Sequence, residues 1–243
     1  MKRLSIFLSL LLLLTLVISQ ATQTALAKEY ESYPTFRQNE GFSLSECVFF
    51  GDSTTYGLFR YNAHNNGKFG KNYYTLQDSQ IWTPKSGTFF LGNLLNCKVA
   101  LSDLGEITLS DALHKKQPPT IIVTVGINGL AAWNKETFTK YYEKLITMIK
   151  TASPKTVIVL QSVYPIAEKA RDTLPAFSNE KIDTVNTWIE ALAVHHKLRY
   201  LNTANVLKDA SGNLAECCHN GDGLHLSTEG FNRMLEYVDR TLS

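Results

Sequence analysis

Short runs of apolar and β-branched residues alternate along this chain with segments in which apolar residues recur every three to four positions. The runs lie at residues 47–50, 98–101, 121–125, 157–160 and 199–201. Continuous apolar runs are typical of strands that are buried on both faces of a sheet. Strands that alternate with helices predict an α/β fold, in which helices cover both faces of a parallel sheet of about five strands.

The helical segments between and after the later runs carry apolar stripes with a period of 3.6 residues. Ser178 and Ser227 are predicted to cap the helices that follow them. His195 and His196 end one helix, where positive charge suits the helix dipole, and we interpret them as structural or solvent-facing. The three stripes are Phe138, Tyr141, Tyr142, Leu145, Met148 and Ile149; Ile182, Val185, Ile189, Leu192 and Ala193; and Phe231, Met234, Leu235 and Val238.

Two polar segments directly follow predicted strands. Gly51-Asp52-Ser53 follows the first strand, and Gly126-Ile127-Asn128 follows the third. Because parallel sheets bind ligands beyond the carboxyl ends of their strands, both segments are predicted at the edge that carries the site. Residues 62–87 have no clear period and are predicted to be an insertion over this edge, with Trp82 as a candidate for substrate stacking.

The N-terminus has the features of a secretory signal. Two basic residues precede an apolar stretch over residues 4–18, and an A-x-A cleavage motif occupies residues 25–27. The stretch is shorter than the roughly 20 residues of a spanning helix, so cleavage is favoured over a retained membrane anchor. We predict a signal peptide at residues 1–27, a single domain at residues 28–243, and a secreted or cell-surface protein without stable membrane insertion.

The charge balance argues against two classes of partner. The sequence has 24 basic and 22 acidic residues, and loss of the signal removes two basic residues, so the two counts become equal. Nucleic acids and anionic membrane surfaces are bound by concentrated positive charge. Neither is therefore expected as a partner.

The four cysteines are Cys47, Cys97, Cys217 and Cys218. Disulfides persist in exported proteins, but the sequence leaves the pairing open. The adjacent Cys217, Cys218 and His219 could indicate a metal site. Because the chain has no C-x-x-C pair, buried or bridged thiols are the preferred interpretation, and no metal is expected.

An acid and an imidazole lie three residues apart in Asp222-Gly223-Leu224-His225. A serine hydroxyl becomes a good nucleophile when a histidine accepts its proton, and this histidine needs an acceptor on its other ring nitrogen. The Asp-x-x-His loop supplies both groups, and Ser53 is the candidate serine; without His225, Ser53 would be read only as a helix cap. Asp52 is predicted to bind backbone amides in the turn.

These segments resemble the SGNH, or GDSL-type, esterase and lipase family. The resemblance is carried by Gly51-Asp52-Ser53, Gly126-Ile127-Asn128 and Asp222-Gly223-Leu224-His225, in this order. It implies a three-layer α/β/α, flavodoxin-like fold with Ser53 as nucleophile, His225 as general base and Asp222 as its orienting acid. It also implies an oxyanion hole made by the Ser53 backbone N–H, a glycine N–H and the Asn128 side-chain amide.

Two glycines bear on this resemblance. Gly105 follows the second predicted strand, which is the place in the chain order of the oxyanion-hole glycine, but a glycine that permits a turn with positive φ is the alternative. Gly129 stands where the family commonly has an aspartate. This departure puts the support of the loop around Asn128 in question more than the chemistry.

The expected activity is that of a secreted serine esterase that removes small acyl groups, such as acetyl, from a carbohydrate through an acyl-enzyme. The substrate is a small-molecule or glycan ester, and no cofactor is expected. Two alternatives stay open. One is a lysophospholipase or thioesterase with the same triad, and the other is a non-catalytic glycan-binding surface protein on the same fold.

Overall fold

A computed structural model describes residues 43–65, 68–69 and 74–242 of the chain. The predicted signal peptide at residues 1–27 lies outside the described residues. Within the described ranges, no helix is both long enough and apolar enough to cross a bilayer.

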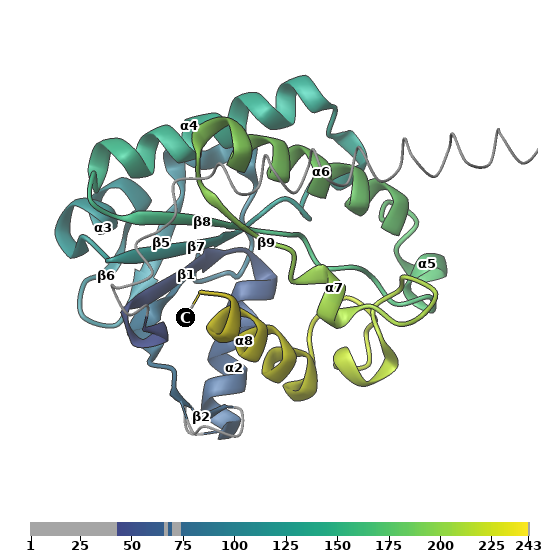
Figure 1. Cartoon of the computed structure of the whole chain (residues 1–243). Coiled ribbons are helices and arrows are strands. Elements are labelled where there is room, and N and C mark those ends of the chain that lie inside the picture. Colours follow the sequence, from purple (N-terminus) through teal and green to yellow (C-terminus); the bar gives the residue numbers. More distant parts are fainter. Residues whose placement is uncertain (1–42, 66–67, 70–73, 243) are drawn as a thin grey trace, which may run out of the picture. The chain divides into compact units, whose positions relative to one another are not determined.

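The central sheet has five parallel strands in the order β4-β1-β7-β8-β9. Figure 1 labels β1, β7, β8 and β9 of this sheet. The α/β class and the five-stranded parallel sheet expected from the sequence are thereby confirmed. In the register of the two central strands, Phe50 of β1 lies beside Val123 of β7. The strands are β1 (Cys47–Gly51), β4 (Ile81–Trp82), β7 (Thr120–Thr124), β8 (Val157–Gln161) and β9 (Arg199–Leu201).

One predicted strand has a different place. Residues 98–101 form β5 (Lys98–Leu101), which pairs antiparallel with β6 (Gly105–Thr108) outside the central sheet. Because Lys98 is exposed, β5 is not buried on both faces, and the segment can therefore lie outside the central sheet. The edge position in the central sheet belongs instead to β4, inside the segment that was predicted to be an insertion. Trp82 of β4 is buried in the core, so its prediction as a substrate-stacking residue is wrong.

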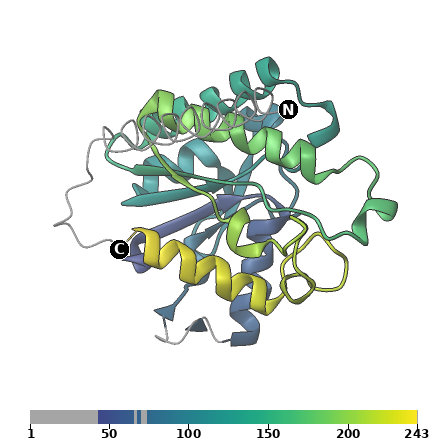
Figure 2. The ribbon, with the colours of Figure 1, turned by 45° about the vertical axis from the view of Figure 1, so that its right-hand side comes forward.

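Helices cover both faces of the sheet, as Figures 1 and 2 show. Alternate strand residues belong to two separate apolar cores: Phe50 and Ile121 pack with the helices of one face, and Phe49 and Ile122 with those of the other. The first face carries α3 (Leu109–Lys116), α4 (Lys135–Ala152) and α6 (Asn179–His196); the second carries α2 (Ser53–Asn65), α7 (Ala204–Leu207) and α8 (Thr228–Leu242).

Short elements connect these layers. The remaining helix within the described residues is α5 (Ala170–Thr173), and a small hairpin is formed by β2 (Lys68–Phe69) and β3 (Tyr74–Thr75). Single turns of 3₁₀ helix are η1 (Leu44–Glu46), η2 (Asp78–Gln80), η4 (Leu130–Ala132) and η5 (Glu216–Cys218), and a longer, kinked one is η3 (Leu91–Asn96).

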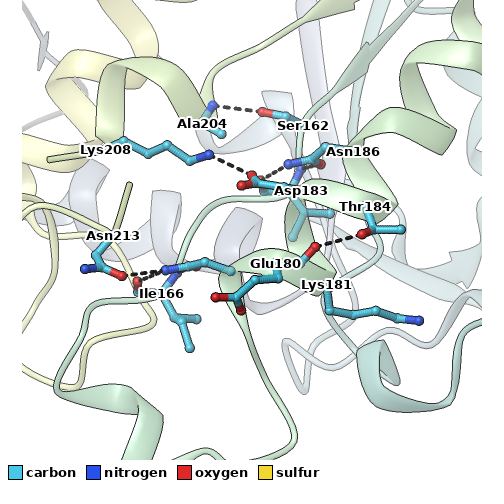
Figure 3. Close-up of polar contacts among 12 residues, drawn as sticks. Ser162, Ile166, Glu180, Lys181, Asp183, Thr184, Asn186, Ala204, Lys208 and Asn213 are labelled. Carbon is cyan, nitrogen blue, oxygen red and sulfur yellow. Dashed lines mark hydrogen bonds and ion pairs between the residues drawn. The ribbon is translucent and has the colours of Figure 1, made fainter. Parts of the chain in front are cut away.

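Polar side chains fix the helices relative to the segments that follow the strands. Both predicted caps are confirmed, because Ser178 Oγ accepts from the N–H of Lys181 and Ser227 Oγ from that of Gly230. Around α6, Asn186 exchanges two hydrogen bonds with the backbone of Val163, just after β8. Figure 3 shows Asn186 beside the contact from the Ala204 N–H to Ser162 Oγ. The carboxyl end of β8 is therefore held to both α6 and α7.

Candidate active site

The turn between β1 and α2 presents Ser53 at the first position of α2. A side chain at Gly51 would place its Cβ 2.4 Å from the carbonyl oxygen of Thr124, so only glycine permits this approach of β1 to β7. Asp52 Oδ1 accepts from the backbone N–H of Thr54 at 3.1 Å and from its hydroxyl at 3.0 Å. The turn role predicted for Asp52 is thereby confirmed.

The second loop lies between η5 and α8 and carries Asp222 and His225. Asp222 Oδ1 accepts the backbone N–H groups of Leu224 at 2.7 Å and His225 at 2.8 Å, so the carboxylate organises its own loop. Gly223 has φ +77°, and a Cβ there would lie 2.8 Å from the Cβ of Ala170. The loop is therefore packed closely against α5.

His219 stabilises the loop that carries Asp222 and His225. The ring is buried, its Nδ1 accepts from the N–H of Gly221 at 3.0 Å, and its Nε2 lies 3.0 Å from Glu216 Oε2. The adjacent Cys217 and Cys218 are free thiols, and their Sγ atoms lie 3.8 Å apart. Cys47 and Cys97 are also free. The carbonyls of Cys217 and Cys218 accept from the hydroxyl and N–H of Ser227, which ties η5 to the start of α8.

The two loops meet at the carboxyl edge of the sheet. His225 Nε2 lies 3.1 Å from Ser53 Oγ, and His225 Nδ1 lies 2.7 Å from Asp222 Oδ2. The three side chains predicted from the sequence thus form one continuous chain of hydrogen bonds. This arrangement can transfer a proton from the serine hydroxyl to a histidine whose other ring nitrogen is held by a carboxylate.

Two carboxyl groups in this region have shifted pKa values of opposite sign. Partial burial raises the pKa of Asp222, but hydrogen bonds from the His225 ring and from the backbone N–H groups of His225 and Leu224 outweigh it and hold the pKa below its ordinary value. Asp222 therefore stays ionised. Asp52 is only 1% exposed, and desolvation raises its pKa from 3.8 to about 6, although hydrogen bonds from Thr54 oppose the shift.

Asn128 lies beyond the end of β7, at the same edge as Ser53. Its Nδ2 atom donates to the carbonyl of Phe89 at 2.9 Å, which fixes the amide and leaves its second N–H for another acceptor. Its own carbonyl accepts from Trp133 Nε1 at 3.0 Å. Gly129 has φ +79°, and a Cβ there would contact the Trp133 ring at 3.5 Å. Trp133, which the sequence analysis did not single out, therefore supports the loop beside Gly129.

Gly105 does not follow a strand of the central sheet, contrary to the expected chain order. It opens β6 of the β5–β6 hairpin, is exposed, and has φ +68°, so the structure places it in a turn that favours glycine. The glycine after the second sheet strand is Gly87, with φ +71° and its N–H bound to the carbonyl of Pro84 at 2.7 Å. The sequence analysis did not single out Gly87, because β4 is only two residues long.

The fold and these segments define a class of protein. The GDSL-like lipase/acylhydrolase family model matches residues 49–233, and the chain belongs to this family. It is therefore an ester hydrolase of the serine type. No curated protein matches the sequence.

Several solved structures share the fold. The chain is similar to a GDSL-like lipase from Bacteroides thetaiotaomicron (20% identity, TM-score 0.53, covering 88% of this chain and 96% of the other). It is similar to a carbohydrate esterase family 3 protein from Talaromyces cellulolyticus (11%, TM-score 0.50, 81% and 95%). It is also similar to the periplasmic domain of a lipopolysaccharide acetyltransferase from Salmonella ser. Paratyphi A (16%, TM-score 0.51, 81% and 83%).

Proposed function

We propose that the protein is an exported serine esterase that removes small acyl groups, such as acetyl, from a carbohydrate. The observation that carries the catalytic part of the proposal is the unbroken chain of contacts from Ser53 Oγ through the His225 ring to Asp222. A non-catalytic binding protein has no need of these contacts. The intact chain therefore counts against the glycan-binding alternative.

In the proposed cycle, Ser53 Oγ attacks the ester carbonyl while His225 Nε2 accepts its proton. Asp222 holds the proton on His225 Nδ1 and stabilises the imidazolium that forms. The free N–H of Asn128 and the backbone N–H of Ser53 donate to the oxyanion of the tetrahedral intermediate. His225 then gives its proton to the leaving alcohol, and it activates the water that hydrolyses the acyl-enzyme. The cycle uses no metal or organic cofactor.

Two considerations support a carbohydrate ester. The predicted signal peptide would deliver the enzyme outside the cytoplasm, where acylated glycans are accessible substrates. The same fold is used by a protein described as a carbohydrate esterase. Sequencing the N-terminus of the protein from culture medium tests the export step, with Lys28 as the expected first residue.

One observation favours a second candidate, an esterase for longer acyl chains such as those of lysophospholipids. Phe89, whose carbonyl binds Asn128, is followed by Phe90 with 51% of its surface exposed, and Leu95 of η3 is 76% exposed. Phe90 is the chain neighbour of a residue that contacts Asn128, so its exposed ring could contact an acyl chain. Phe90→Ala separates the two candidates: it leaves an acetyl esterase unchanged on acetate and lowers the activity of a long-chain esterase on octanoate.

The test is hydrolysis of p-nitrophenyl esters from acetate to octanoate by the purified protein and by Ser53→Ala and His225→Ala. We expect kcat/KM to fall by at least about 10³-fold in both variants and activity to decrease steeply as the chain grows. Ser211→Ala and His114→Ala change exposed residues outside the site and serve as matched controls. Activity that survives in Ser53→Ala, or that is absent from the wild type, would refute the mechanism.

Specificity needs natural substrates as well. Release of acetate from an acetylated oligosaccharide should exceed release of fatty acid from lysophosphatidylcholine. If release of fatty acid exceeds release of acetate, the second candidate, an esterase for longer acyl chains, is favoured. The roles proposed for the triad residues would not change.

A further inference from the structure

Three potential metal ligands come together between α4 and α6, far from the proposed triad in the fold. Glu143 of α4 and the adjacent His195 and His196 at the end of α6 each offer one ligand atom, and these atoms all lie within 4.8 Å of one another. The two imidazole rings have centroids 4.9 Å apart. Two imidazole nitrogens and one carboxylate oxygen are a donor set that suits Zn²⁺ and related transition-metal ions.

A second observation points to a ligand at the same place. His196 Nε2 is buried, and in the described part of the chain it has no hydrogen-bond partner. A buried polar atom without a partner costs free energy, so such an atom calls for an explanation. A bound cation would satisfy it.

The local charges are compatible with a cation. Lys150 and Glu143 both lie near enough to the His196 ring to act on it electrostatically, with opposite signs. Glu143 supplies the negative charge that opposes Lys150. Because Lys150 is exposed, its flexible side chain can turn into solvent when an ion binds.

We propose that Glu143, His195 and His196 form a binding site for one divalent transition-metal ion, represented by Zn²⁺, which joins α4 to α6. Small side-chain rotations bring the three ligand atoms onto one ion, and water completes the coordination.

The position of this site predicts a structural role. His196 ends α6 just before β9 begins at Arg199, so the three ligands lie at the amino edge of the parallel sheet. Ser53 follows the end of β1 and lies at the opposite, carboxyl edge. The ion should therefore stabilise the fold without taking part in ester hydrolysis, and this proposal does not depend on the proposed esterase function.

Isothermal titration calorimetry with ZnCl₂ tests the proposal, on protein first stripped of metal with a chelator and then freed of the chelator. The wild type should bind one Zn²⁺ at this site, and Glu143→Gln, His195→Gln and His196→Gln should each weaken this binding by at least about tenfold. Since His195 is exposed, His195→Gln tests the site without disturbing the core. A thermal scan should show a higher Tm with Zn²⁺ for the wild type and a smaller increase for these variants.

Two controls identify other zinc sites. His114→Gln removes an exposed histidine on α3, and Cys217→Ser removes the exposed thiol next to Cys218. Both should bind Zn²⁺ at the proposed site as the wild type does. The proposal is overturned if the wild type binds no Zn²⁺, if the three ligand variants bind it unchanged, or if Cys217→Ser alone abolishes binding.

Discussion

The Nε2 atom of His225 lies 3.1 Å from Oγ of Ser53, although 172 positions separate the two residues. Packing between α2 and α8 makes this contact possible. A Cβ at Gly57 of α2 would lie 2.7 Å from Phe231 of α8, and Tyr61 of α2 donates to Asn232 of α8 at 2.6 Å. Ser53 opens α2 and His225 lies in the loop three residues before α8 begins, so their separation depends on the helix contact.

Replacement of Asp222 by asparagine should lower kcat by about 10²- to 10⁴-fold with little change in KM. The amide keeps an oxygen for the N–H groups of Leu224 and His225, but its NH₂ group cannot accept from His225 Nδ1, which favours the wrong tautomer. Asp209→Asn is the matched control, because Asp209 also accepts two backbone N–H groups, outside the site. Equal activity in the two variants would exclude Asp222 as the orienting acid.

Asn128→Ala should reduce kcat by about 10²- to 10³-fold through the loss of one oxyanion donor. It also removes the contact to the carbonyl of Phe89, so thermal unfolding must be measured beside the kinetics. A defect confined to KM would indicate that Asn128 binds substrate and does not stabilise the transition state.

Gly223→Ala and Gly212→Ala form a matched pair of substitutions at positive φ. Both should lose stability on the order of 1 kcal/mol through backbone strain. Only at Gly223 does the new Cβ meet another atom, Ala170 Cβ at 2.8 Å, and only this glycine lies between Asp222 and His225. We expect Gly223→Ala to lower kcat as well, whereas Gly212→Ala should keep full activity. Urea unfolding and ester hydrolysis on both variants check this, and equal activity would show that the triad loop tolerates displacement.

The free energy of unfolding of Asp52→Asn, minus that of the wild type, should increase as the pH rises from about 4 to 6.5. The pKa of Asp52 is raised to about 6 in the folded state, so over this interval the folded state binds more protons than the unfolded state. The wild type therefore loses stability as the pH rises, by up to about 3 kcal/mol from this residue. Urea unfolding of both proteins at several pH values measures the difference. A difference that is constant, or that shrinks with pH, would contradict the raised pKa.

Much of the site could be predicted because its residues sit in recognisable local patterns. Ser53 directly follows an apolar run, and Asp222 and His225 share one loop of four residues, so their chemistry is visible from residue type and spacing. Contacts between distant segments were not visible. Trp133 supports Asn128 through an indole N–H, and nothing in the pattern of residues 126–133 distinguishes this role from core packing.

The fold shows the same division. The sequence by itself determined the parallel α/β architecture and the order of the catalytic groups, because buried strands and amphipathic helices leave periodic apolar patterns. Only the tertiary structure decided that Ile81–Trp82 forms the edge strand and that residues 98–101 form a separate hairpin. Two-residue strands carry no periodicity, and their place depends on the hydrogen bonds that neighbouring segments offer once the core has formed.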